Sequence, residues 1–255
     1  WNVTRFRTMT APVKDNSDLK QIVSRIERDQ LNDDDQAILL QLAATLDEAE
    51  KLHGEYEFNA VLQTIYRFFW NDFCDWYVEV SKTRLADEKS RDTCLAIQDI
   101  CIRHILLLLH PVTPFITEEL WKVLAFAKDE SIQFVSPGTG KELLDTLNGA
   151  DINLDGKVLE EIQGVRELVT SMRSLKADRN LSNNREVEFF YLAEDEKAEV
   201  LNRNIPSILT TVGAAAMNRT EEAQSGMPTL ISDFGSIYLD LSSGIDIGAE
   251  KARLE

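Results

Sequence analysis

The sequence predicts a mainly α-helical protein in which an antiparallel helical bundle is followed by a small α+β domain. In the first half, apolar residues recur every three or four positions in four segments joined by short connections. After a break rich in glycine and proline, strand-like segments alternate with further helical ones. A chain of 255 residues is also long enough for two domains that each bury a core.

The first two helical segments have different characters. Segment 35–53 follows a run of aspartates and precedes Gly54, and its apolar residues lie on one face. Acidic residues favour the first turn of a helix and glycine commonly ends one, so we expect an amphipathic helix here. Segment 58–80 continues the pattern, but its density of aromatic residues indicates burial on more than one face. It is expected to be a central helix.

Segments 93–109 and 114–124 complete the predicted bundle. The first is strongly apolar and ends before Pro111, because a residue that precedes proline disfavours the helical conformation. The second begins with Thr113 as N-cap and proline at the first helical position. We assign residues 1–134 to the bundle.

The composition then changes. Residues 135–156 hold several glycines and one proline in a polar setting, which predicts a linker. The remainder, residues 157–255, is predicted to be a small α+β domain. We expect its helices over residues 158–176 and 197–212, its strands over 186–192, 214–219 and 235–241, and a final charged helix over 245–255 that stops without a capping signal.

The formal net charge is −17, whereas proteins that bind nucleic acids usually display a basic surface. Charge is not spread evenly, however. Residues 1–28 contain six basic and three acidic residues, and residues 166–185 contain five basic and two acidic ones, so that each segment carries +3. These two basic islands leave RNA binding open.

The cysteines and the ends of the chain suggest a location. Cys74, Cys94 and Cys101 are odd in number and lie in helical segments, which predicts free thiols in a reducing, cytoplasmic compartment. The longest apolar run, 105–109, is far shorter than the roughly 20 residues of a membrane span. The chain begins without Met and without an apolar leader, so we expect no signal peptide and an internal start.

Signatures of catalysis are missing from the sequence. It contains no Gly-rich phosphate loop, no GxSxG elbow, no HExxH and no CxxC pair, so we do not expect this chain to catalyse a reaction alone. Cys94, Cys101 and His104 could share one helix face, which keeps a metalloprotein as an alternative. We expect no metal, because these residues lie in an apolar helix with no fourth ligand. His53 and His110 stand at expected helix ends, where they can complement the last carbonyls.

The first residues form a different constellation. On a helix, Asn2, Arg5 and Phe6 lie at positions i, i+3 and i+4 and project from one face. RNA loops are read by such a set, since aromatic rings stack on splayed bases, amides read base edges, and guanidinium groups bind phosphate or stack. Spacing alone favours the alternative in which Trp1 and Phe6 pack into the bundle and Arg5 points to solvent.

Two longer motifs are more specific. Residues 70–77 (WNDFCDWY) and 110–121 (HPVTPFITEELW) resemble the two signatures of the anticodon-binding bundle of class I aminoacyl-tRNA synthetases. Their physical roles are expected to be mainly structural: the large rings Trp70, Phe73, Trp76 and Tyr77 fill core, and Asp72 and Asp75, which face no nucleophile, serve surface or hydrogen-bonding roles.

Within that family, the valyl enzymes are the most similar. The FCDWY form at residues 73–77 resembles them more than the isoleucyl, leucyl or methionyl enzymes, and the zinc cysteines of the isoleucyl enzymes are missing. Residues 165–181 look like the helix and turn that follow the bundle. Residues 238–255 look like the strand and helix that lead into the C-terminal coiled-coil arm of the valyl enzymes, here truncated.

The resemblance implies a function. Asn2, Arg5 and Phe6 are implied to contact the middle and third anticodon bases of tRNA(Val). The full-length enzymes attach valine to this tRNA using ATP and Mg²⁺, but no cofactor is expected in the present residues. We expect a monomer with no DNA or membrane partner. The alternatives are the corresponding region of an isoleucyl- or leucyl-tRNA synthetase, and a helical protein-interaction scaffold without an RNA role.

Overall fold

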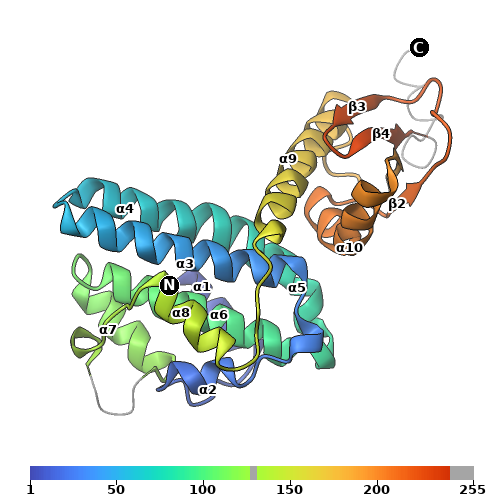
Figure 1. The fold of residues 1–255 in the computed structure, drawn as a ribbon. Coiled ribbons are helices and arrows are strands. Elements are labelled where there is room, and N and C mark those ends of the chain that lie inside the picture. The colour runs from blue at the N-terminus through green and yellow to red at the C-terminus, as the bar shows by residue number, and fades with distance from the viewer. Residues whose placement is uncertain (127–130, 242–255) are drawn as a thin grey trace. The chain divides into compact units, whose positions relative to one another are not determined.

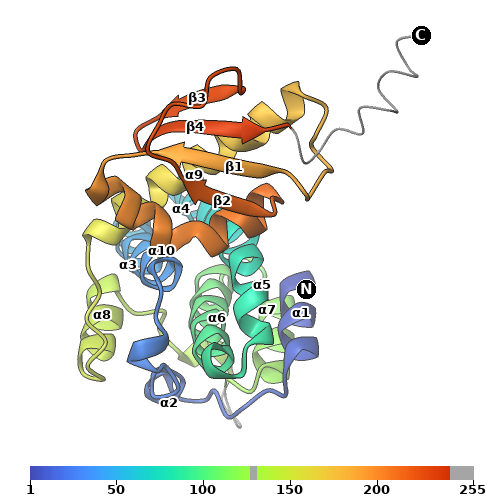
Figure 2. The same ribbon diagram turned by 90° about the vertical axis from the view of Figure 1, so that its right-hand side faces the viewer.

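The computed structural model describes residues 1–126 and 131–241. It divides into two compact units, Trp1–Leu159 and Glu160–Glu255 (Figures 1 and 2). The first is a helical bundle and the second a small α+β unit, so the predicted fold class is confirmed.

Unit 1 is built around three long helical stretches. The α3 helix and the α4–η2–α5 stretch lie side by side, and the apolar α6 packs against both (Figure 1). Shorter helices cover the remaining sides. In chain order the elements are α1 Asn2–Thr10, α2 Leu19–Val23, η1 Arg28–Gln30, α3 Asp33–Gly54, α4 Phe58–Arg67, η2 Phe68–Tyr77, α5 Val78–Ala86, α6 Glu88–Leu109, α7 Pro114–Val123, η3 Ile132–Phe134 and α8 Gly140–Asn148.

The predicted central helix contains a π-helical segment, η2, in its middle. The buried positions of η2 fall at Phe68, at residues 72–73 and at residues 76–77, slightly more than four apart, as the wider i→i+5 turns require. Trp70 lies between these positions and is 48% exposed. The expectation that Trp70 fills core is therefore wrong, whereas Phe73 and its partners in the motif are buried as expected.

The motif residues of η2 hold the start of α3. The Trp76 indole Nε1 donates to Asp34 Oδ1 at 2.7 Å, and the Tyr77 hydroxyl donates to Asp35 Oδ1 at 2.7 Å. Asp35 also forms a capping box with Asn32 and an ion pair with Arg84 of α5. The aspartate run thus caps a helix and ties it to its neighbour.

The predicted linker over residues 135–156 differs from the structure. Residues 140–148 form α8, which begins with a Thr139–Glu142 capping box and packs on α3. A Cβ on Gly140 would lie 2.1 Å from the carbonyl oxygen of Ala43, and the Gly140 amide donates to Asp47 Oδ1 at 2.7 Å. Glycine here permits a close approach of two helices, a use that composition cannot distinguish from chain flexibility.

Unit 2 contains a four-stranded sheet of order β2-β1-β4-β3, in which β1 is parallel to β2 and antiparallel to β4. The helices α9 and α10 cover the face that carries the alternating buried residues of β1 (Figure 2). Strand β3 was not predicted from the sequence. It has no buried residue, and Ile231 within it is 87% exposed. The predicted helix at 245–255 lies outside the described residues. The elements are α9 Lys157–Asp178, β1 Glu188–Leu192, α10 Asp195–Val212, β2 Ala216–Arg219, β3 Thr229–Ser232 and β4 Gly235–Asp240.

Candidate functional site

The three predicted site residues lie on α1, which is helical as the constellation requires. Asn2 and Arg5 are exposed. Phe6 is partly buried and packs against a core cluster that includes Leu85 and Leu95. Phe6 is therefore compatible with both interpretations of the sequence. Its ring packs on the bundle, and part of its surface remains accessible to RNA.

Trp1, which precedes α1, is 69% exposed, so it does not pack into the bundle as the structural alternative proposed. On η2, burial and then the carboxylate of Asp75 raise the pKa of the Cys74 thiol to about 11.

A pair of rings on the α4–η2 stretch was missed from the sequence. Tyr66 and Trp70 lie one turn apart, their ring planes are 9° from parallel with centroids 6.3 Å apart, and they are 63% and 48% exposed. Arg67 between them is also exposed. Flat, accessible rings beside a cation are typical of surfaces that bind unpaired bases. The only available signal was the i, i+4 spacing of two aromatic residues.

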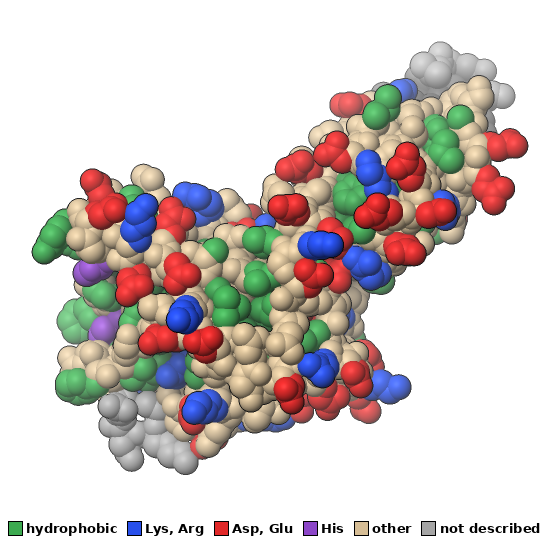
Figure 3. Space-filling view, viewed as in Figure 1, with side chains coloured by type: hydrophobic (Ala, Val, Ile, Leu, Met, Phe, Trp, Pro, Cys, Tyr) green, Lys and Arg blue, Asp and Glu red, His purple; other side chains and the backbone are tan. Residues whose placement is uncertain are grey.

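The basic islands have a different use from the one their charge suggested. In the first, Arg7 and Arg25 both pair with Asp99, and Lys14 pairs with Asp92. In the second, Lys176 is buried and Arg173 donates to the Thr211 carbonyl at the end of α10. Figure 3 shows acidic and basic side chains interspersed on one face of the protein. At least five of these eleven cations therefore make hydrogen bonds or ion pairs within the fold.

The histidine and cysteine cluster of α6 belongs to the core. Cys94 and Cys101 are fully buried, burial raises the pKa of both thiols, and that of Cys94 reaches about 12. His104 Nδ1 lies 2.7 Å from the Ile100 carbonyl oxygen, and burial lowers its pKa to about 4. Within residues 1–126 and 131–241, no group of three His, Cys, Asp or Glu side chains is arranged to hold a metal ion. The metalloprotein alternative thus loses its structural support.

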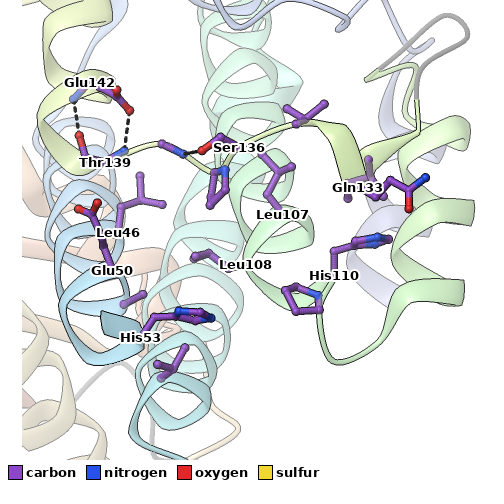
Figure 4. A pocket seen from close by; sticks show the side chains of 17 residues that line it. Leu46, Glu50, His53, Leu107, Leu108, His110, Gln133, Ser136, Thr139 and Glu142 are labelled. Carbon is purple, nitrogen blue, oxygen red and sulfur yellow. Dashed lines mark hydrogen bonds between the residues drawn. The ribbon is translucent and has the colours of Figure 1, made fainter. Parts of the chain in front are cut away.

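A hollow of about 520 Å³ opens between α3, the end of α6 and the segment around η3 (Figure 4). Its lining is mainly apolar, with His53 and His110 among the polar residues. The polar groups at one end are already bonded, because Glu142 and Thr139 form the capping box of α8. His110 Nδ1 lies 2.7 Å from Thr117 Oγ1 of α7, which ties the HPVTP turn together.

Comparison with known proteins identifies the family of the bundle. Residues 35–191 match the family model for the anticodon-binding domain of tRNA ligase. The chain belongs to this anticodon-binding family. The two motifs that resembled class I synthetase signatures, residues 70–77 and 110–121, both lie inside the matched region.

The relatives of this anticodon-binding chain include several valine–tRNA ligases. Those of Coxiella burnetii, Thermotoga maritima and Bacillus subtilis are 32%, 31% and 30% identical to it, and each match covers the whole chain. The chain spans only 27–28% of the length of these relatives. In the described part of the chain, no helix has the length and apolar character needed to cross a membrane.

Proposed function

We propose that this chain is the tRNA-recognition part of a valine–tRNA ligase and that α1 reads the anticodon of tRNA(Val). The observation that carries the proposal is the exposure of Asn2 and Arg5 beside an accessible part of Phe6 on one short helix of an anticodon-binding bundle. Full coverage of the chain by valine–tRNA ligases supports valine over isoleucine or leucine. Three free cysteines fit action in the cytoplasm.

The proposed contacts follow from the chemistry of the three side chains. Phe6 stacks on an unpaired base with its exposed surface, Arg5 binds a phosphate or a base edge, and Asn2 donates and accepts hydrogen bonds at a base edge. Their targets are the middle and third anticodon bases. The ring pair Tyr66–Trp70 offers a second stacking surface for neighbouring loop nucleotides.

The binding of ATP and Mg²⁺ is not attributed to this chain. The longer protein would join valine to tRNA(Val) using ATP and Mg²⁺. The sequence has no Gly-rich phosphate loop, and the described residues hold no cluster of carboxylates suited to Mg²⁺. We therefore assign the binding of ATP and Mg²⁺ to the rest of the longer protein. We also propose that the longer protein acts as a monomer.

The test is valine charging of tRNA(Val) by the full-length ligase that contains this chain. Phe6→Ala should weaken tRNA binding by about 1–3 kcal/mol, because a stacked aromatic ring is lost, and Arg5→Ala should weaken it in the same direction. Ile231→Ala is the control, because Ile231 is an exposed apolar side chain in unit 2. Unchanged kinetics in Phe6→Ala and Arg5→Ala would remove α1 from the site.

The scaffold alternative predicts a different response to salt. If Arg5 and its neighbours bind tRNA phosphates, affinity falls steeply as the salt concentration rises, because bound counterions are released. An apolar groove for a protein partner would be much less sensitive. Salt-independent tRNA binding would contradict the proposed role of α1.

A further inference from the structure

A buried charged side chain, together with the packing of Phe6, attaches α1 to the bundle. Among its nine residues only Thr4 and Arg7 are buried, and Arg7 is 1% exposed. Its guanidinium makes a two-point contact with Asp99 of α6, from Nε to Oδ1 at 2.7 Å and from Nη2 to Oδ2 at 2.9 Å. The third nitrogen, Nη1, donates to the Ala11 carbonyl at the end of α1.

Asp99 joins α1 to several other segments. The Arg25 guanidinium donates to Asp99 Oδ2 at 3.2 Å and to the Asn16 side-chain oxygen at 2.7 Å. The Asn16 amide in turn donates to the Leu124 carbonyl after α7, at 2.9 Å. Apart from Arg25, whose side chain is 14% exposed, the network is buried, and it includes residues from four separate segments of unit 1.

The geometry of the pair determines the direction of the helix face. A two-point contact between a planar guanidinium and a carboxylate restricts both distance and orientation. Arg7 directly follows Phe6, and each helical residue is rotated by about 100° from the one before it, so a fixed Arg7 sets where Asn2, Arg5 and Phe6 point. A helix held by a thin apolar stripe could rotate or slide more easily.

We propose that Arg7 and Asp99 are positioning residues for anticodon reading: their buried ion pair sets the angle at which α1 presents Asn2, Arg5 and Phe6 to the RNA. The inference rests on the function proposed above. Neither residue touches the RNA. Stability alone is a weak reason for such a pair, because the desolvation of two buried charges offsets much of their attraction.

The same unit provides a matched control. Arg84 and Asp35 form a second ion pair, with side chains 18% and 0% exposed, but this pair joins α5 to the start of α3, and its hydrogen-bond partners are Gln30, Asn32 and Tyr77. Lysine at either arginine position keeps the charge and loses the planar guanidinium. In Arg7 this group binds Asp99 at two points, and in Arg84 it binds Asp35 and the Gln30 carbonyl. Arg7→Lys and Arg84→Lys thus cause the same chemical change at two places.

The experiment uses the full-length ligase and measures kcat/KM for tRNA(Val) and for tRNA(Val) with a substituted middle anticodon base. Arg7→Lys should reduce discrimination between the two RNAs by about tenfold, mainly through KM for the cognate tRNA, whereas Arg84→Lys should retain it at a comparable loss of Tm. Asp99→Glu, which keeps both charges and shifts the carboxylate by one methylene, should act in the same direction as Arg7→Lys and provides a second reading if Arg7→Lys folds poorly.

Equal discrimination in Arg7→Lys, Arg84→Lys and the parent would overturn the positioning role, and so would an equal loss in both variants. Phe6→Ala separates the two proposals. If Phe6→Ala abolishes discrimination and Arg7→Lys does not, only the positioning role fails. If Phe6→Ala leaves discrimination intact, α1 does not read the anticodon and the proposed function fails first.

Discussion

Within the described residues, each unit buries one cation almost completely, but the two cations bind different groups. In unit 1, Arg7 faces the carboxylate of Asp99, which lies 92 residues away in the sequence. In unit 2, the Lys176 ammonium donates to the carbonyl oxygens of Asn184, Val212 and Gly213 at 2.8, 3.1 and 2.6 Å. Two of these carbonyls stand at the end of α10, where helix carbonyls lack partners.

The difference shows how charge can serve two structural purposes. A guanidinium paired with a carboxylate fixes orientation between distant segments, as the attachment of α1 requires. An ammonium with three rotatable donors instead satisfies a helix end locally and needs no counterion. Burial lowers the pKa of Lys176, and Arg185 and Arg173 add to this effect, whereas Arg7 remains next to a carboxylate. The two arrangements should therefore respond differently to mutation.

The largest expected effect is that of Asp99→Ala, which leaves Arg7 buried without its counterion. Removal of one partner of a buried ion pair typically lowers the free energy of unfolding by about 3–5 kcal/mol. Urea denaturation of the purified variant measures this loss. A loss below about 1 kcal/mol would contradict the view that Arg7 depends on a carboxylate.

His104 extends the comparison to a buried base with no carboxylate partner. Burial lowers its pKa from 6.5 to about 4, so the folded protein binds fewer protons than the unfolded chain within that interval. The associated stability is present above pH 6.5 and is lost as the pH falls toward 4, by roughly 3 kcal/mol. Urea denaturation at several pH values between 4 and 6.5 measures how the free energy of unfolding changes with pH, and this dependence should be weaker in His104→Leu. If the free energy of unfolding depends on pH equally in both proteins, groups other than His104 cause the dependence.

Lys176→Met should cost less than Asp99→Ala, because it leaves unpaired carbonyl groups but no unpaired charge. Buried polar groups without partners lower stability by about 1–3 kcal/mol. Arg179→Met, at an exposed position just after α9, is the control and should change stability little. A loss in Lys176→Met as large as in Asp99→Ala would remove the distinction between the two arrangements.

The smallest effect is expected at the surface pair of Lys14 and Asp92, whose side chains are 49% and 53% exposed. Lys14→Ala should lower the free energy of unfolding by less than about 1 kcal/mol, because solvent and salt screen exposed charges. Thermal unfolding at low and high salt checks this. An effect above that size, unchanged by salt, would mean that exposure does not separate the two kinds of ion pair.

The helices and the family could be predicted from local patterns of residues. The aspartates before α3, Pro114 at the start of α7 and the three- and four-residue apolar spacing each act within one or two helical turns, so their meaning hardly depends on the rest of the chain. The motifs 70–77 and 110–121 indicated the family for the same reason, because each is a continuous stretch of sequence. The helical setting of Asn2, Arg5 and Phe6 was predicted in this way too.

The roles of particular side chains depended on neighbours that are distant in sequence. Arg7 resembles a surface cation until Asp99 is placed beside it, and Gly140 resembles a flexible linker residue until Ala43 is placed against it. Trp70 resembles core until η2 turns it outward. Periodicity reports which face of a helix is apolar, but the partner that a buried charge meets is set by tertiary packing. For that reason the bundle followed from the sequence, and the attachment of α1 required the structure.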